Sequence, residues 1–429
     1  MMNQEQNDLI TRIGPNTPCG RLMRNYWQPA ALTAELADSR PIKAVRLLGG
    51  EFVLFRDEAG RLGLMDRDCP HRGADLAFGR LENGGLRCAF HGWLFDVEGK
   101  CLETPAEPAN SPLCQNIRQR AYPVVERSGI LWAYLGEGEP PAFPETDCFV
   151  ALGAYTFAFK GLMECNWLQA LEVGIDPAHA SFLHRFFEDE DTSASYGKQF
   201  RAKSAGSDLP MTRILREYDR PIINVERTEY GLRLIALRQL NDEQMHVRVT
   251  NQLFPHAFVI PMSAEMTITQ WHVPVDDENC YWYAIFTSYA QPVDKQKMRD
   301  QRLQLYELPD YRSRRNRAND YGFDPHARAP WAIGQGHHSV PAAPARADRK
   351  GSGRPEADAL PRRHECTRRP GSRHHGRHWA GVRLGNVLDG GRRQASQRRA
   401  LDGAGSSRDR GQNAAPVGRG IERAGRGPQ

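Results

Sequence analysis

Three runs in the first third of the chain alternate apolar with polar residues: 44–66, 86–105 and 129–144. Gly, Asp and Pro bound these runs. A period of two with such boundaries is typical of short antiparallel strands. We therefore predict a small all-β domain over residues 41–145, preceded by a segment, residues 1–40, that packs on the core. Residues 136–145, which are rich in Gly, Glu and Pro, predict a linker at the end of this domain.

The pattern changes after the linker. Residues 155–187 have the pattern of a strand followed by a helix, and residues 295–308 have a helical pattern. Further strand-like runs lie between these two segments, at 231–240, 246–261, 266–275 and 280–289. We predict an α+β chain in which the all-β domain precedes a second domain, residues 146–333, with an antiparallel sheet and covering helices.

Residues 334–429 differ in character from the rest of the chain. They consist largely of Arg, Gly, Ala and Pro, with few aliphatic residues and no period. Such a composition cannot bury enough apolar surface to offset the entropy lost on ordering. Two interpretations remain open, a disordered basic tail or a reading frame that slips between residues 328 and 335. In the second case the domain before the tail is incomplete.

The net charge of +5 is unevenly distributed. Residues 341–429 contain nineteen Arg and one Lys against eight acids, which leaves the first 340 residues at −7. Nucleic-acid binding is therefore not expected of the folded part. No run reaches the roughly 18 to 20 apolar residues that span a membrane, and the first residues lack a signal-peptide pattern. Nine irregularly spaced cysteines favour reduced thiols. We expect a cytoplasmic protein.

Two short segments each pair one cysteine with one histidine. Cys69 precedes His71, and Cys88 precedes His91, with a glycine soon after each pair. Zinc fingers place like ligands together, as Cys with Cys and His with His. The mixed pairs suit instead a two-iron, two-sulfide cluster in which one iron takes two thiolates and the other two imidazoles. A zinc site and unrelated buried thiols are the alternatives.

The spacing C-x-H, followed some sixteen residues later by C-x2-H, resembles the Rieske motif of the ring-hydroxylating oxygenase family, and most closely its phthalate-oxidising members. The resemblance extends from the N-terminus to about residue 330. It implies a Rieske [2Fe–2S] domain over residues 41–145 and a catalytic domain with a mononuclear iron(II) over residues 146–333.

A second candidate site lies at Asp176, His179 and His184. Asp176 followed by Pro177 predicts the start of a helix that carries both histidines. Five residues separate two side chains by about 140° on an ideal helix, so one iron could take both only if the helix is distorted. Two unrelated histidines are therefore an equal alternative on spacing alone.

The family's D-x2-H-x4-H pattern matches these three residues. The resemblance implies that His179 and His184 bind the mononuclear iron and that Asp176 links His179 to His91 of a neighbouring subunit. Asp176 as a simple helix cap is the alternative. The family's third ligand is an aspartate that would fall in the anomalous tail. Asp348 is the nearest acid there, and its surroundings resemble no ligand-bearing helix, so the third ligand is left unassigned.

Arg238 is a candidate to bind a substrate carboxylate. Strand alternation places it on one face with Leu232, Leu234, Ala236 and Leu240. A guanidinium on an apolar face is costly unless it meets an anion, and Arg238 could bind a carboxylate with two hydrogen bonds. A salt bridge to a protein acid is the alternative. Arg201 is a second, weaker candidate.

The resemblance implies the oxygenase component of an aromatic-ring dioxygenase that adds O2 to phthalate or a related aromatic carboxylate. An NADH-dependent flavin and iron–sulfur reductase would supply electrons, and no dinucleotide-binding fingerprint is seen in this chain. Electron transfer across a subunit boundary implies a homo-oligomer, a trimer or stacked trimers. An O-demethylase or monooxygenase, an electron carrier with an inactive second domain, and a nucleic-acid binder that uses the basic tail are the rival interpretations.

Overall fold

A computed structural model describes residues 2–182, 209–263 and 265–322. The chain begins with two short helices, α1 (Gln4–Thr11) and α2 (Pro18–Arg24). Asn3 begins α1 with a reciprocal capping box, in which its side chain accepts a hydrogen bond from the backbone of Gln6 and the side chain of Gln6 accepts one from the backbone of Asn3. Thr17 caps α2, and Pro18 occupies its first turn, where no backbone donor is needed.

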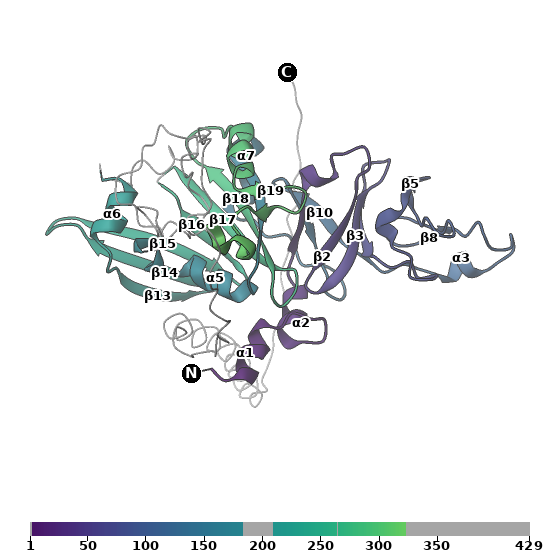
Figure 1. Cartoon of the computed structure of the whole chain (residues 1–429), viewed down its shortest axis with the longest axis horizontal. Helices are drawn as coiled ribbons and strands as arrows, with labels where there is room; N and C mark the ends of the chain where they lie inside the picture. Colours follow the sequence, from purple (N-terminus) through teal and green to yellow (C-terminus); the bar gives the residue numbers. More distant parts are fainter. Residues whose placement is uncertain (1, 183–208, 264, 323–429) are drawn as a thin grey trace, which may run out of the picture. The chain divides into compact units, whose positions relative to one another are not determined.

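The first β region contains three small sheets (Figure 1). The three-stranded sheet has the order β1 (Gln28–Leu32), β11 (Ile130–Ala133), β10 (Val124–Arg127). A four-stranded sheet has the order β2 (Ile42–Leu47), β3 (Gly50–Arg56), β4 (Leu62–Asp66), β9 (Ala121–Tyr122). The other four-stranded sheet has the order β5 (Arg80–Glu82), β6 (Gly85–Arg87), β7 (Leu94–Phe95), β8 (Cys101–Glu103). Short helical segments lie between these strands: η1 (Thr33–Leu36), η2 (Leu76–Phe78) and α3 (Leu113–Asn116).

The second region is built on a nine-stranded sheet. Its order is β13 (Ile222–Thr228), β14 (Gly231–Gln239), β15 (Met245–Leu253), β16 (Ala257–Pro261), β17 (Met266–Pro274), β18 (Cys280–Ser288), β12 (Thr156–Met163), β20 (Arg312–Ser313), β19 (Tyr306–Glu307). Its strand pairs are antiparallel except for a single parallel contact of β12 with β20. The predicted fold class, an all-β region followed by an antiparallel sheet with helices, is confirmed.

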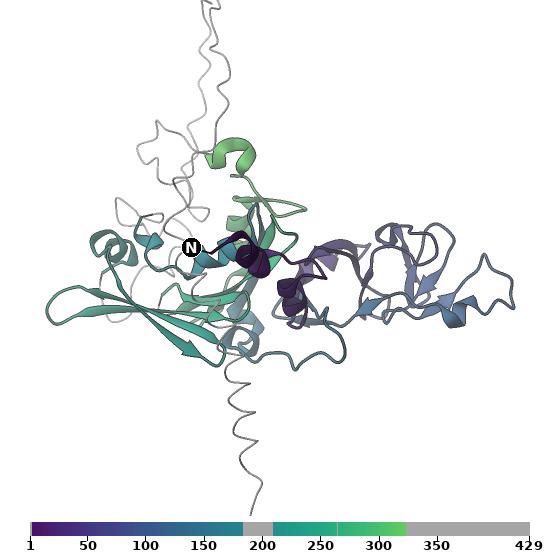
Figure 2. The ribbon, with the colours of Figure 1, turned by 90° about the horizontal axis from the view of Figure 1, so that it is seen from below.

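Helices accompany the large sheet (Figures 1 and 2). They are α4 (Asp147–Val150), η3 (Gly153–Tyr155), α5 (Trp167–Ile175), η4 (His179–Ser181), α6 (Met211–Glu217), α7 (Lys295–Leu303) and η6 (Arg317–Gly322). The helix α5 contacts β15, β16 and β17, and α7 contacts β12. At Gly174 in α5, an added Cβ would lie 2.2 Å from the Phe258 ring, so this glycine allows the close approach of helix and sheet.

Two predicted boundaries are corrected, and one strand was missed. The predicted run 246–261 forms two strands, because the chain turns between Leu253 and Ala257. The predicted helix 295–308 ends at Leu303, and β19 follows it. The strand β13 was missed, because its burial alternates only between half-buried and exposed positions and carries little apolar signal. The domain boundaries at residues 40, 145 and 333 stay predictions.

Candidate metal and substrate sites

The two Cys and His pairs lie in two loops with the same backbone hydrogen bonds. Gly73 donates its N–H to the Cys69 carbonyl at 2.9 Å, and Cys69 donates its own to the Ala74 carbonyl at 2.8 Å. The second loop repeats both bonds at the same spacing, from Gly92 to Cys88 at 3.1 Å and from Cys88 to Trp93 at 2.8 Å. Each turn needs a residue with positive φ, and the glycines supply it at 66° and 75°.

The loops bring the four predicted cluster ligands together. The rings of His71 and His91 lie 4.6 Å apart between centroids. The Cys69 and Cys88 thiols are in hydrogen-bond contact, and burial raises the pKa of Cys69 to about 11. The Nδ1 atom of His91 is buried and has no hydrogen-bond partner in the described structure. A buried imidazole nitrogen without a partner, beside two paired thiols, fits a ligand set for a [2Fe–2S] cluster.

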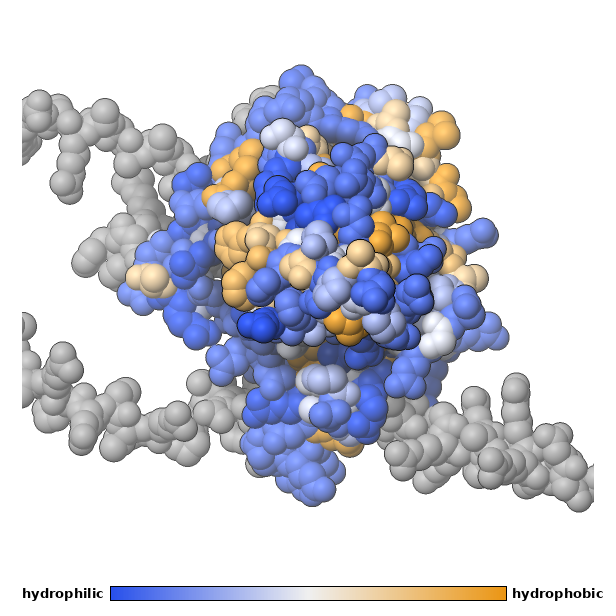
Figure 3. Space-filling model, turned by 90° about the vertical axis from the view of Figure 1, so that its right-hand side faces the viewer, coloured by the Kyte–Doolittle hydropathy of each residue, from blue (hydrophilic) through white to orange (hydrophobic). Residues whose placement is uncertain are grey.

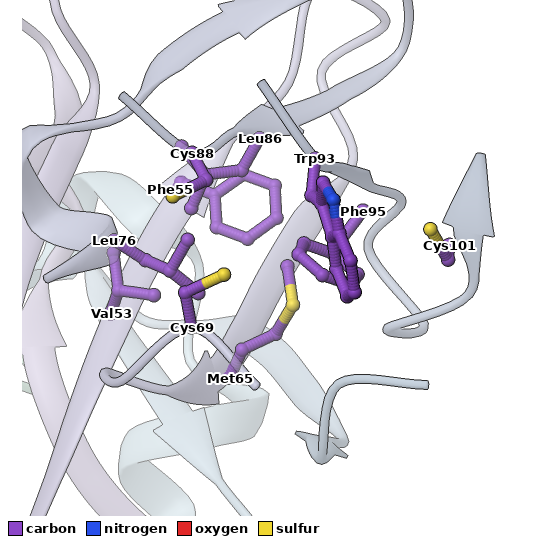
Figure 4. Close-up of a cluster of buried hydrophobic side chains, with 10 residues drawn as sticks. All are labelled: Val53, Phe55, Met65, Cys69, Leu76, Leu86, Cys88, Trp93, Phe95 and Cys101. Carbon is purple, nitrogen blue, oxygen red and sulfur yellow. The ribbon is translucent and has the colours of Figure 1, made fainter. Parts of the chain in front are cut away.

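An apolar core surrounds the two sulfurs (Figure 4). Cys69 and Cys88 are almost fully buried among residues of β3, β4, β6, β7 and β8, of η2 and of the loop before β7: Val53, Phe55, Met65, Leu76, Leu86, Trp93, Phe95 and Cys101. The Trp93 ring stacks on His71 at 4.4 Å between centroids with an interplanar angle of 3°. Trp93 therefore covers one face of an imidazole, and the surrounding apolar side chains keep water from the sulfurs.

An arginine just before each cysteine braces its loop. Arg67 forms a bidentate pair with Asp75 at 2.9 and 2.6 Å. Arg87, which is buried, donates to the Gly92 carbonyl at 2.6 Å and to Glu103 at 2.6 Å. Sequence analysis missed both arginines. Their position one or two residues before a ligand was the only signal, and their partners are known only from the fold.

The described residues contain no group of three or more His, Cys, Asp or Glu side chains placed to hold one metal ion. The predicted cluster does not require such a group, because each of its irons takes two protein ligands and two sulfides. The mononuclear iron does require it. Of its predicted ligands only His179 lies in the described part of the chain, because His184 falls outside it.

His179 follows α5 in a turn organised by Asp176. Asp176 ends α5 and its carboxylate accepts a hydrogen bond from the Ala178 N–H at 2.7 Å. The His179 Nδ1 contacts the backbone carbonyl of Asp176. Burial lowers the pKa of His179, although Asp176 opposes the shift. The predicted helix start at Pro177 is wrong in the described residues, because Asp176 caps the end of α5 and only the short 3-10 turn η4 follows.

Arg238 is buried on the predicted face of β14. Leu232, Leu234 and Ala236 share that face, and Arg238 is 2 % exposed. Its Nε donates to the Tyr218 carbonyl at 2.9 Å and its Nη2 to the Pro177 carbonyl at 3.1 Å. Its Nη1 is buried and has no partner among the described residues. The contact with Pro177 places the guanidinium beside the Asp176–His179 turn.

Sequence analysis missed two basic residues next to Arg238. His246 lies opposite Arg238 in the sheet, and Arg248 lies opposite Ala236, one step further along the same face. Burial, together with the charge of Arg238, lowers the pKa of Arg248 to about 10. Burial and both guanidinium charges lower the pKa of His246 to about 4. Within the described ranges neither arginine forms an ion pair. Arg201, the other predicted substrate residue, lies outside the described residues.

Two further histidines are buried on the same sheet. His256 and His272 are 2 % and 3 % exposed, and all four of their ring nitrogens lack a partner in the described structure. His272 donates its backbone N–H to the His256 carbonyl at 3.0 Å and stacks its ring on Phe258. Burial lowers the pKa of each to about 3, so both are neutral. Their neighbours are apolar or aromatic residues, so the sequence marked this stretch only as strand.

Two family profiles match the chain. The profile described as Rieske [2Fe-2S] domain matches residues 26–123. The profile described as LigXa C-terminal domain like matches residues 134–334. The first match confirms that the chain contains a Rieske domain, whose predicted bounds stay a prediction. The second match ends where the composition of the chain changes.

Three relatives are similar over both regions. The phthalate 4,5-dioxygenase oxygenase subunit of Pseudomonas putida is 37 % identical over 306 residues, covering 68 % of this chain and 65 % of that subunit. The 5,5'-dehydrodivanillate O-demethylase oxygenase subunit of Sphingobium sp. is 35 % identical, covering 65 % and 61 %. The 3-chlorobenzoate-3,4-dioxygenase oxygenase subunit of Comamonas testosteroni is 31 % identical, covering 74 % and 72 %. The chain spans less than two thirds of the length of the first two.

A solved structure has the same fold. Dicamba monooxygenase bound to 3,6-dichlorosalicylic acid aligns with a TM-score of 0.50 and 22 % identity, covering 67 % of this chain and 85 % of that one. In the described ranges no helix is long and apolar enough to cross a membrane.

Proposed function

We propose that this chain, which belongs to the Rieske non-haem iron oxygenases, is the oxygenase component of a dioxygenase. Its proposed substrate is phthalate or a similar aromatic carboxylate. The predicted Rieske [2Fe–2S] cluster is confirmed by the matching Rieske profile, and the predicted mononuclear iron is part of this proposal. In the proposed reaction both atoms of O2 add to the ring and the product is a cis-dihydrodiol.

The proposal depends on the pair of guanidinium groups of Arg238 and Arg248. Neither group has an acidic side chain as a partner among the described residues. Two like charges on one half-buried sheet face destabilise each other unless an anion binds between them. Arg238 is already oriented by the Tyr218 and Pro177 carbonyls, which leaves its Nη1 for a carboxylate oxygen. A carboxylate bound there would hold its aromatic ring beside the His179 turn.

We assign the remaining roles as follows. Cys69, His71, Cys88 and His91 hold the cluster, and His179 with His184 holds the mononuclear iron, which supplies the site at which O2 reacts. Asp176 is exposed, with its backbone carbonyl on the His179 ring. This exposure suits the proposed link to His91 of a second subunit in a trimer or stacked trimers.

An NADH-dependent flavin and iron–sulfur reductase is the proposed electron donor. The loop that carries His91 also carries Phe90, which is 63 % exposed and lies 4.1 Å from the His91 ring between centroids. Phe78 is also exposed. On the face seen from the β5 and β8 side, apolar residues are interspersed with hydrophilic ones (Figure 3). A mixed surface of this kind suits a transient redox partner better than a permanent one.

The test is product analysis on the full chain, purified anaerobically with iron and sulfide and supplied with NADH and a Rieske-system reductase. With phthalate and labelled O2, the proposal predicts a dihydrodiol that carries two labelled atoms. Arg238→Met is expected to raise the KM for phthalate about a hundredfold, as when a buried charge partner is removed. The control is Arg233→Met on the same strand, whose guanidinium pairs with Glu226 at 3.3 Å.

O-demethylation of an aromatic acid is the second candidate, favoured by the similarity to 5,5'-dehydrodivanillate O-demethylase. It predicts formaldehyde from a methoxybenzoate and no dihydrodiol from phthalate. Two irons per chain and no product from either substrate would instead identify an electron carrier, because the oxygenase requires three.

A further inference from the structure

Two thiols that have no role in the proposed function lie together just before α5. The strand β12 ends at Met163, directly opposite Cys280 in β18, and Cys165 follows two residues later. The two sulfurs are in hydrogen-bond contact. Cys280 is fully buried, whereas Cys165 is half-buried and open to a small reagent. Neither cysteine forms a disulfide in the described structure.

The two thiols have opposite acidities. The hydrogen bond from Cys280 lowers the pKa of Cys165, and the charge of Arg317 adds to this effect against the opposing effect of burial. The hydrogen bond to Cys165 and burial raise the pKa of Cys280. Arg317 is fixed nearby, because its Nη2 donates to the Glu164 carbonyl at 2.8 Å and its backbone N–H to the Glu164 carboxylate at 3.0 Å.

We propose that Cys165 and Cys280 form an oxidative modification site, at which a peroxide converts the two adjacent thiols into an intramolecular disulfide. The Cys165 thiolate attacks the peroxide oxygen, the O–O bond breaks, and hydroxide leaves and takes up a proton as water. The resulting sulfenic acid is attacked by the Cys280 sulfur, which loses its proton as the second water leaves. Two thiols thus give two electrons to one hydrogen peroxide and yield one disulfide and two waters.

The surrounding structure already holds these two segments together. Asn166, next to Cys165, caps α5 and donates its Nδ2 to the Asp277 carbonyl at 2.8 Å, three residues before Cys280. A disulfide would therefore add a covalent link across an existing contact and would not require the fold to rearrange. It would attach the segment just before α5 to the first residue of β18. Asp176 lies at the other end of α5.

Another close pair of thiols provides an internal comparison. The Cys114 thiol donates to the Cys101 carbonyl at 3.4 Å. Burial raises the pKa of Cys101 to about 12, so Cys101 offers little thiolate to a peroxide at neutral pH, whereas the pKa of Cys165 is lowered. The proposal therefore predicts that Cys165 and Cys280 are linked before Cys101 and Cys114.

The test is peptide mapping of the full, iron-loaded chain after treatment with a small molar excess of hydrogen peroxide. Remaining thiols are blocked under denaturing conditions, and trypsin then releases residues 161–185 and 249–295, which contain one cysteine each. We expect a linked pair of these peptides that dithiothreitol separates, absent in Cys165→Ser and in Cys280→Ser and retained in Cys148→Ser. The proposal would be overturned if both cysteines were recovered with the blocking reagent attached, because no disulfide would then have formed. It would also be overturned if Cys165 were over-oxidised while Cys280 carried the blocking reagent.

A rate measurement separates thiol activation from simple proximity. Alkylation of Cys165 by iodoacetamide at pH 7 should slow in Cys280→Ala and in Arg317→Met, by about tenfold for each unit that the pKa rises. The matched control is Arg314→Met, which removes a guanidinium paired with Glu307 at 2.8 Å. Unchanged alkylation in both variants would overturn the assignment of Cys165 as the attacking thiol. These readouts do not depend on the proposed aromatic substrate.

Discussion

The loops with the predicted cluster ligands and the strands with Arg238 and Arg248 reach their geometry by different means. In each loop a cysteine and a histidine lie within one turn, closed by two backbone hydrogen bonds and a glycine with positive φ. Arg238 and Arg248 lie ten residues apart and meet only because Ala236 pairs with Arg248 between β14 and β15. The first arrangement is local, and the second depends on sheet register.

This difference predicts how each region tolerates change. A ligand in a loop can be removed without moving a strand, so its loss should abolish one cofactor and leave the fold in place. A change in the sheet acts through register and burial, so it should alter stability together with binding. The predictions below test that contrast.

The largest expected effect is in the loops. Cys88→Ser removes one of two thiolates from one iron, and we expect complete loss of the visible absorption and of the reduced-state paramagnetic signal of the cluster. Far-ultraviolet circular dichroism should stay close to that of the wild type. Cys148→Ser is the control, because Cys148 is fully buried in α4 and lies far along the chain from the loops. A fully coloured Cys88→Ser protein would contradict the ligand assignment.

The second effect concerns the sheet and acid. Burial lowers the pKa of His256 and of His272 to about 3, far below the value of about 6.5 in an unfolded chain. Below pH 6.5 the unfolded chain therefore binds protons that the folded chain does not, and stability falls as pH falls. Each histidine should cost about 2 kcal/mol of unfolding free energy at pH 5.

The variant His272→Phe tests this loss, because a phenylalanine can keep the stacking on Phe258 and cannot take up a proton. Urea unfolding at pH 7.5 and at pH 5.0 should show a smaller loss in the variant, by about 2 kcal/mol. An equal loss in variant and wild type would mean that His272 is protonated in the folded chain.

The sequence predicted the local arrangement better than the arrangement that depends on register. Cys69, His71, Cys88 and His91 were predicted as ligands because ligand type and spacing lie within two short segments, and the structure brings their side chains together. Arg238 was found because alternation along a single strand predicts burial. Arg248 was missed, since its neighbours His246 and Thr250 are polar and the face of β15 is defined only by pairing with β14.

The fold shows the same limit. The strands β3, β12, β17 and β18 were predicted from dense apolar runs, which the structure buries. The edge strand β13 has no buried residue and gave no such signal. The turn at Asp176 was interpreted as the start of a helix, because an Asp–Pro pair is common there, but α5 ends at this point and the aspartate caps a turn.

The third effect distinguishes the two loops from each other. An added Cβ at Gly73 meets nothing within 4 Å, whereas at Gly92 it would lie 2.9 Å from the Pro105 ring. Gly73→Ala should therefore cost only the strain of positive φ, about 1 kcal/mol. Gly92→Ala should add the displacement of a proline ring, for a total of about 3 kcal/mol. Equal losses in chemical denaturation would show that the Pro105 contact gives way freely.

The smallest effect is the most diagnostic for the sheet. Arg248 is half-buried, repelled by Arg238 and without an ion pair in the described residues, so in the absence of substrate it should destabilise the fold. Arg248→Met should therefore raise the unfolding free energy by up to about 1 kcal/mol while it weakens binding of an aromatic dicarboxylate about tenfold. Removal of an arginine with only a structural role would lower the unfolding free energy and leave the affinity for the dicarboxylate unchanged. Thermal unfolding with and without phthalate measures both changes, in stability and in binding, in one experiment, because a ligand that binds more tightly adds more to stability.

A variant that is less stable without ligand and equally stabilised by phthalate would assign Arg248 to packing and leave Arg238 as the carboxylate partner in this sheet.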